Sequence, residues 1–278
     1  MRPKTILVVA NQTLGGAKLL EEVKREADEN TRLILCVPRT RPKHGNVIYD
    51  ETVIDAAKVR IDLARRFMRA QGMGVIGEIG DEDPFHATMD AIAEHRPDAL
   101  IISTLPSTSS GWMRRDLIER IQDATNIPVT HVEQDIDAEG LPFHVTLVLA
   151  AKTAVADELL EHLRTKAAQG ERQHMFIIVV PQESAAGGAA AQARARMAQL
   201  VDRCVATGLL AAGMTGDPDP YMATMNALQL FRVDDIVIST LPATRSGWLR
   251  ADLIERVRKA SNKPVEHIEA HEPAGAAA

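Results

Sequence analysis

Two nearly identical loops rich in hydroxyl groups hold the side chains best suited to chemistry. They are Ser103–Gly111 (STLPSTSSG) and Ser239–Gly247 (STLPATRSG). Each loop precedes a helical pattern, so its hydroxyls and the N–H groups that open the helix would hold an anion. The hydroxyl candidates are Ser103, Thr104, Ser109, Ser110, Ser239, Thr240 and Ser246. The alternative is structural: Ser109 or Ser110 caps the helix, and Pro106 rigidifies a turn.

Cations distinguish the second copy of this constellation. Lys152 and Arg245 stand where the first copy has Gln12 and Ser109. Two cations at one crevice favour a phosphate or a carboxylate, so the second copy is the better candidate for an anion site. The remaining ligand-binding candidates, at the ends of apolar runs and in the helices after the loops, are Asn11, Thr13, Thr153, Arg114 and Arg250.

The two arginines have a second interpretation. Arg114 and Arg250 lie on the first turn of the helix after each loop, within reach of the same anion. An ion pair with Asp116 or Glu119 accounts for them equally well, and such surface pairs contribute little stability. The two tryptophans of the chain open the same helices and are favoured as packing anchors over ligand platforms.

Acidic and histidine side chains also invite a metal interpretation, which the patterns do not favour. Asp83 and Asp219 each precede a proline, as helix N-caps followed by proline at the first helical position do. His131 and His267 lie two residues before a glutamate, on one face of a strand. A hydrogen bond at an interface between repeats is the default interpretation of these histidines, with a metal site as the alternative. No catalytic or metal residue is assigned.

Both constellations belong to an internal repeat. Gly80–Ile92 (GDEDPFHATMDAI) recurs as Gly216–Leu228 (GDPDPYMATMNAL), and the loop regions and the PV-x-H-x-E segments recur at the same offset. Agreement without gaps over three blocks means duplication of a whole unit. We predict one domain over residues 1–138, a second over 139–270 and a flexible tail over 271–278, with the boundary in the polar stretch Gln134–Pro142.

Each copy alternates strand and helix patterns. In the first, strands are expected at the apolar runs Thr5–Ala10, Arg32–Val37, Val75–Ile79, Ala99–Ile102 and Val129–Glu133. Helices are expected between them, among them Ile54–Met68 with Ala57, Ile61, Ala64 and Met68 on one face, and Trp112–Ala124. The fold class is therefore α/β, with two doubly wound five-stranded parallel sheets of order 3-2-1-4-5 in tandem, related by a pseudo-two-fold axis. Ligands of such sheets bind between strands 1 and 4.

With the elements placed, each repeat resembles the universal stress protein family over its whole length. The resemblance rests on the polar residue that ends the first strand, the GD-x-DP turn, the Ser/Gly-type loop after the fourth strand and the final PV strand. It implies a cytoplasmic regulator, and tandem forms of the family build the dimer within one chain. Fifth strands would then pair across the pseudo-two-fold axis and cover each other's edges.

The resemblance implies ATP or AMP as the candidate cofactor, but the ATP pattern is incomplete. ATP-binding members carry an acidic residue at the end of strand 1, where this chain has Asn11 and Ala151. They also carry a Gly-x2-Gly-x9-Gly-Ser/Thr loop. Its places are taken here by Ser103, Pro106, Asp116 and Leu117, and by Ser239, Pro242, Asp252 and Leu253. Those glycines let N–H groups close on phosphates, so we expect ATP to bind weakly or not at all.

Composition limits the partners. The 278 residues carry a net charge of −6 and only 3% aromatic residues, which argues against nucleic acid. The apolar runs are strand-sized, two cysteines form no framework, and no signal-peptide pattern occurs, so we expect a cytoplasmic protein without a membrane partner. A protein partner is left open.

The leading hypothesis is a non-enzymatic, stress-type regulatory or ligand-binding protein with a small anionic ligand or nucleotide at the crevice. Two alternatives stay open at this point. One is an ATP-binding or slowly ATP-hydrolysing protein with an unconventional loop. The other is a structural interaction module whose crevices are vacant.

Overall fold

The computed structural model describes residues 3–39, 50–106, 116–182, 187–242, 246–250 and 252–271. The chain divides into two compact units. Unit 1 comprises Met1–Arg41 and Arg60–Pro142, and unit 2 comprises Pro42–Val59 and Phe143–Ala278. The division of the sequence at residue 138 stays a prediction about the repeat. Among the described residues, no helix combines the length and the apolar character that crossing a bilayer requires.

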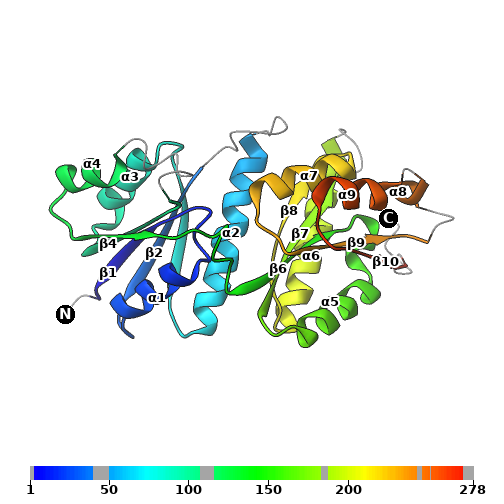
Figure 1. Cartoon of the computed structure of the whole chain (residues 1–278), viewed down its shortest axis with the longest axis horizontal. Helices are drawn as coiled ribbons and strands as arrows, with labels where there is room; N and C mark the ends of the chain where they lie inside the picture. Colours follow the sequence, from blue (N-terminus) through cyan, green and yellow to red (C-terminus); the bar gives the residue numbers. More distant parts are fainter. Residues whose placement is uncertain are drawn as a thin grey trace. The chain divides into compact units, whose positions relative to one another are not determined.

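Unit 1 alternates strands and helices in the predicted sequence (Figure 1). Its strands are β1 (Thr5–Val9), β2 (Arg32–Pro38), β3 (Val75–Gly80), β4 (Ala99–Thr104) and β5 (Val129–Glu133). Its helices are α1 (Ala17–Glu26), α3 (Pro84–His95) and α4 (Leu117–Ala124), and α2 (Asp50–Ala70) is divided between the two units at Arg60. The five strands fall where the apolar runs predicted them.

Unit 2 repeats this arrangement. Its strands are β6 (Phe143–Leu149), β7 (Gln173–Pro181), β8 (Leu210–Gly216), β9 (Asp235–Thr240) and β10 (Val265–Glu269). Its helices are the 3-10 helix η2 (Lys152–Val155), α5 (Asp157–Gln169), α6 (Gly187–Ala206), α7 (Pro220–Leu230), α8 (Gly247–Arg250) and α9 (Leu253–Ser261).

Both sheets are five-stranded and parallel, with the order β3-β2-β1-β4-β5 in unit 1 and β10-β9-β6-β7-β8 in unit 2. The predicted order 3-2-1-4-5 is confirmed in each copy. Two such sheets in tandem fit the universal-stress-protein-like arrangement that the sequence resemblance implies. The winding reverses between β1 and β4, and between β6 and β9, which puts a ligand crevice at the carboxyl ends of these strands.

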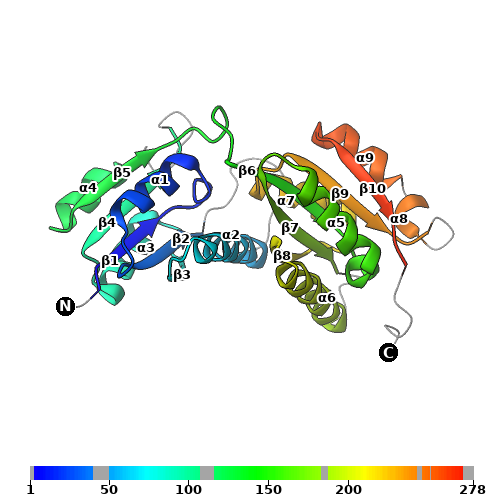
Figure 2. The same ribbon diagram turned by 90° about the horizontal axis from the view of Figure 1, so that it is seen from below.

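The central strands are buried on both faces, as their unbroken apolar runs predict. In unit 1, Leu7 and Val9 pack with Ala87 of α3 and Leu117 of α4. In unit 2, a cluster of buried residues joins the central strands to α5 and α6. The helices α7 and α9 contact each other (Figure 2). The apolar face predicted for Ile54–Met68 is confirmed, since all four of its residues are buried. Each sheet is thus a rigid platform whose strand ends hold the loops.

The cap prediction at the third helix of each repeat is confirmed. The Asp83 carboxylate accepts a hydrogen bond from Phe85 N at 2.8 Å, with Pro84 at the first helical position. Asp219 accepts the same bond from Tyr221 N at 2.8 Å. A metal ion is not needed to explain these carboxylates.

The prediction of one continuous fourth helix is wrong. Asp116 has φ +47° and Asp252 has φ +50°, in the left-handed region, which cannot continue a right-handed helix. In unit 2 this splits the segment into α8 and α9, and in unit 1 the described helix begins only at Leu117. Aspartate tolerates this conformation better than most residues, and the hydrophobic pattern does not reveal it.

Candidate functional site

The ends of the first and fourth strands meet in each unit, as the crevice prediction requires. The Thr13 hydroxyl donates to Ser103 O at 3.1 Å in unit 1, and the Thr153 hydroxyl donates to Ser239 O at 3.1 Å in unit 2. All four residues are buried. This repeated bond locks the turn after the first strand onto the end of the fourth and fixes the floor of the crevice.

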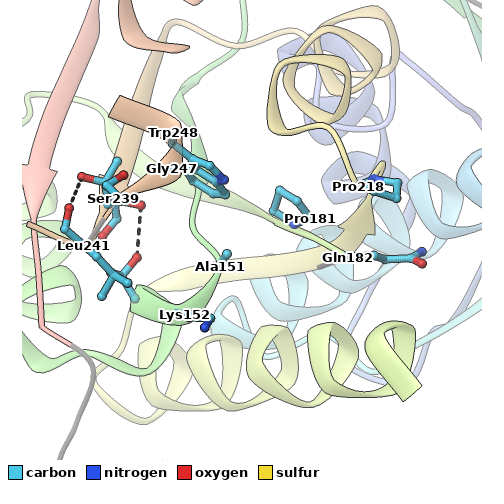
Figure 3. Close-up of a pocket in the computed structure, with 12 residues that line it drawn as sticks. Ala151, Lys152, Pro181, Gln182, Pro218, Ser239, Leu241, Gly247 and Trp248 are labelled. Atoms are coloured by element: carbon cyan, nitrogen blue, oxygen red, sulfur yellow. Dashed lines mark hydrogen bonds between the residues drawn. The ribbon is translucent and has the colours of Figure 1, made fainter. Parts of the chain in front are cut away.

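Unit 2 holds a pocket of about 310 Å³ at this point (Figure 3). It is lined by Ala151, Lys152, Thr153, Pro181, Gln182, Pro218, Ser239, Thr240, Leu241, Ser246, Gly247 and Trp248. Hydroxyl groups and one ammonium group therefore meet the apolar surface of two prolines and a tryptophan. Such a mixture is typical of sites for small ligands with both a polar and an apolar part.

In unit 2, the structure brings together the predicted residues whose side chains it describes, whereas Asn11, Thr13, Ser103 and Thr104 lie at the equivalent place in unit 1. Lys152, Thr153, Ser239, Thr240 and Ser246 all line the pocket. The predicted positions 109, 110, 114 and 245 (Ser109, Ser110, Arg114, Arg245) lie outside the described residues, as does the side chain of Arg250. Those members of the predicted site stay predictions.

Several lining residues escaped the sequence prediction. Pro181 ends β7, Gln182 follows it, and Pro218 follows β8, at the same edge of the sheet. Trp248, which the sequence favoured as a packing anchor, also lines the pocket. The parallel order brings all these strand ends to one edge. Residues that follow β7 and β8 therefore belong to the pocket lining as well.

The two equivalent serines differ in hydrogen bonding. In unit 1, Gln134 Nε2 donates to Ser103 Oγ at 3.1 Å and to Thr13 O at 2.7 Å. In unit 2, Ser239 Oγ is buried and has no partner in the described part of the chain. A buried hydroxyl without a partner costs stability. A ligand that supplied a hydrogen-bond partner to Ser239 Oγ would remove this cost.

A paired substitution between the repeats causes this difference. Gln134 and Gly16 of unit 1 correspond to Ala270 and Ala156 of unit 2. A Cβ atom on Gly16 would lie 2.0 Å from Gln134 Oε1, so the glutamine side chain occupies the space that the Ala156 methyl fills in unit 2. Gln134 was expected only as part of a polar linker. It is instead buried and holds the crevice of unit 1 together.

Asn11 follows β1 at the equivalent edge of the unit 1 sheet. Its Nδ2 donates to Pro38 O at 2.7 Å, which ties β1 to the end of β2. Its Oδ1 is buried without a hydrogen-bond partner among the described residues, and unit 2 has Ala151 at this place. Asn11 therefore supports the crevice of unit 1 and leaves one acceptor there unused.

The histidines of the fifth strands bind within their own units. His131 Nε2 pairs with the Thr104 hydroxyl at 2.9 Å, and His267 Nε2 pairs with the Thr240 hydroxyl at 2.9 Å. Burial lowers the pKa of both imidazoles, and the glutamate two residues on offsets this only in part. Both rings are thus held in the neutral form, next to the crevice.

The backbone is left-handed at the position where the ATP pattern has its third glycine and this chain has aspartate. Asp116 and Asp252 stand at that place in the two repeats and adopt the left-handed conformation that glycine favours. The turn is therefore kept while a carboxylate is added. An added negative charge works against a triphosphate at this position.

Comparisons with known proteins give limited information. No family model matches the chain, and no curated protein matches it. A universal stress protein from Archaeoglobus fulgidus DSM 4304 is 16% identical over 97% of both chains, with a TM-score of 0.37. A keto acid-selecting NRPS module with adenylation, ketoreductase and pseudo Asub domains is 10% identical over 96% of this chain and 30% of its own, with a TM-score of 0.25. Scores this low support no argument about function, which rests on this chain's own residues.

Proposed function

We propose that the chain is a ligand-binding regulatory protein of the stress type, and that unit 2 binds a small anionic ligand in its crevice. The observation that carries the proposal is Ser239, a lining residue of the pocket whose buried hydroxyl has no described partner, together with Lys152 in the same lining. A ligand oxygen would accept from this hydroxyl and from the lysine ammonium group. Hydrogen bonds with a charged partner are the stronger kind.

The size of the pocket favours a compact ligand. At about 310 Å³ it stands at the lower end of the range of ligand pockets, roughly 300–1,000 Å³. Pro181, Pro218 and Trp248 supply apolar surface for a ring or a short carbon skeleton. A nucleoside monophosphate such as AMP therefore suits the site better than ATP, whose outer phosphates would extend into solvent.

Binding without turnover is the role that the hydroxyl geometry supports. The Thr240 hydroxyl donates its hydrogen to Leu241 O at 2.9 Å. Its proton is therefore not offered to His267, as a nucleophile's proton would have to be. We accordingly propose a cytoplasmic regulator that senses a metabolite, and assign no reaction to it.

Calorimetric titration with AMP, ATP and inorganic phosphate tests the proposal. AMP is expected to bind once per chain and more tightly than ATP. Ser239→Ala and Lys152→Ala should each weaken AMP binding about tenfold. The matched variants at the equivalent positions of unit 1, Ser103→Ala and Gln12→Ala, should leave it unchanged.

Three results would contradict the proposal. Two AMP molecules per chain would mean that both crevices bind. Unchanged affinity in Ser239→Ala would put the site elsewhere. Absence of binding by all three compounds would favour the structural module with vacant crevices.

Pairing of the two repeats stays a prediction about the partner. The sequences of β5 and β10 share the pattern PV-x-H-x-E, and each strand ends the order of its sheet. An edge strand needs cover, and equivalent edges suit pseudo-symmetric contact. Light scattering should give the mass of one chain, whereas a stable dimer of chains would argue that the edges are covered between molecules.

A further inference from the structure

Three side chains with metal-binding atoms meet in unit 1, away from the crevice. Glu78 lies on β3, and Glu94 and His95 end α3, which contacts β3 (Figure 2). One donor atom from each lies within 4.8 Å of the other two, and Glu78 Oε2 is 2.7 Å from His95 Nε2. Metal–ligand distances are about 2.0–2.2 Å, so two ligands of one ion lie no more than roughly twice that distance apart. Small changes of side-chain conformation would therefore bring all three donor atoms onto one ion.

The fold positions these groups by backbone register. Glu78 pairs with Cys36 on the neighbouring strand, and the Cys36 thiol contacts Ala87 O of α3 at 3.7 Å. The side chain of Glu78 therefore faces the helix that carries the other two donors. Arg96 follows with φ +47° and ends α3, which fixes Glu94 and His95 on its last turn.

The same place in unit 2 is apolar. Met214, Leu230 and Phe231 stand at the positions of Glu78, Glu94 and His95, and all three are buried. The fold therefore packs well with no polar group at any of these positions. Unit 1 has three metal-binding residue types there in place of three core residues.

Charge at this place favours a cation. Asp90 and Glu94 lie one helical turn apart on α3, where like charges repel. Glu78 adds a third carboxylate, and neither Asp90 nor Glu94 has an ion pair among the described residues. A divalent cation would neutralise this cluster of carboxylates.

The donor set selects the kind of metal. Cys36, the strand neighbour of Glu78, is not among the residues whose donor atoms come together. Two carboxylate oxygens and one imidazole nitrogen remain. This set suits Zn²⁺, Co²⁺ and Mn²⁺ better than the soft ions that prefer sulfur.

We propose that Glu78, Glu94 and His95 form a binding site for a divalent transition-metal ion, with water at the open coordination positions. Three protein ligands plus water is a common arrangement for zinc. The site connects the edge strand β3 to the end of α3. Metal binding should therefore stabilise this part of unit 1 and leave the crevice of unit 2 unaffected.

Titration of the full chain with Co²⁺, followed by visible absorption, tests the proposal. The wild-type chain should show a saturable ligand-field band at one Co²⁺ per chain that one equivalent of Zn²⁺ removes. His95→Phe, which copies unit 2, should abolish the band, and Glu94→Gln should weaken binding at least tenfold. His86→Gln, a change of an exposed histidine near the start of α3, should have no effect.

Thermal unfolding with and without Zn²⁺ separates metal binding from folding. Glu94 is exposed, so Glu94→Gln should keep the metal-free Tm and lose the rise that Zn²⁺ causes in the wild type. If His95→Phe does not fold, Glu94→Gln alone decides whether these residues bind the metal. Absence of saturable binding by the wild type, or binding that survives Glu94→Gln unchanged, would overturn the proposal.

Discussion

The crevices of the two units are built on the same hydrogen bond and differ in the side chains that pack against it. In both, a threonine hydroxyl after the first strand bonds to the carbonyl at the end of the fourth. In unit 1 the Gln134 amide also reaches this point and satisfies Ser103 Oγ. In unit 2, Ala156 and Ala270 fill the space, and Ser239 Oγ has no described partner. Duplication kept the scaffold, while one paired substitution left the serine hydroxyl at the end of the fourth strand without a described partner in unit 2 and bonded in unit 1.

The largest expected effect comes from Gly16→Ala. The new methyl would lie 2.0 Å from Gln134 Oε1 and must expel the side chain. We expect the free energy of unfolding to fall by about 2–3 kcal/mol, from overpacking and the loss of two hydrogen bonds. Urea denaturation measures this change.

The double variant Gly16→Ala/Gln134→Ala is the control, because it copies unit 2. It should recover at least half of the loss, since the methyl then fills vacated space. Gly16 N still donates to Thr13 O at 2.9 Å, so that carbonyl keeps a partner. A double variant as unstable as Gly16→Ala would mean that the two positions are not coupled.

The reverse exchange should close the pocket of unit 2. In Ala156→Gly/Ala270→Gln, the new amide would have room to donate to Ser239 Oγ and to Thr153 O. Competition for this hydroxyl should weaken AMP binding about tenfold, or about 1.4 kcal/mol. Calorimetry measures the affinity, and Ala270→Gln alone, in which the Ala156 methyl still occupies the space, separates this effect from simple overpacking. Unchanged affinity in the double variant would show that Ser239 Oγ does not contact the ligand.

Two serine variants should differ in their effect on stability. Ser103→Ala removes one acceptor of Gln134 and should lower the free energy of unfolding by about 1 kcal/mol. Ser239→Ala removes an unpartnered buried hydroxyl and should leave stability unchanged or raise it by about 1 kcal/mol. Denaturation of the ligand-free chain distinguishes them. Equal losses in both variants would indicate that Ser239 Oγ has a partner after all.

The smallest effect is expected from pH, and the fifth-strand histidines of the two units should contribute to it equally. Burial holds the pKa of His131 and His267 below the ordinary value of 6.5, so below pH 6.5 the unfolded chain binds more protons. Their contribution is complete above pH 6.5 and is lost as the pH falls toward the folded-state pKa. His174, whose pKa burial also lowers, acts in the same direction in unit 2.

Denaturation at pH 7.5 and pH 5.5 checks this symmetry. His131→Gln and His267→Gln should each reduce the loss of stability at pH 5.5 by a similar amount, because each histidine bonds to the equivalent threonine. A pH effect confined to one of the two variants would show that these strands differ in environment between the units.

The sequence determined the scaffold because its signals are local and repeated. Unbroken apolar runs predicted the strands, and Asp83 with Pro84 predicted the start of α3. Strict alternation of strand and helix then leaves few windings, so the strand order and the place of the crevice followed. Part of the pocket lining followed too, since Thr153, Ser239 and Lys152 stand at or next to strand ends.

Tertiary structure alone decided how each crevice is closed. Gln134 and Gly16 are far apart in the sequence, and their contact depends on β5 ending beside β4. The sequence shows that Gln134 of the first repeat is replaced by Ala270 in the second, directly after the PV-x-H-x-E segment. No local pattern indicates that the Gln134 amide turns into the crevice. The left-handed backbone at Asp116 was hidden for a related reason: hydrophobic spacing reports which face of an element is buried, and carries no information about a single dihedral angle.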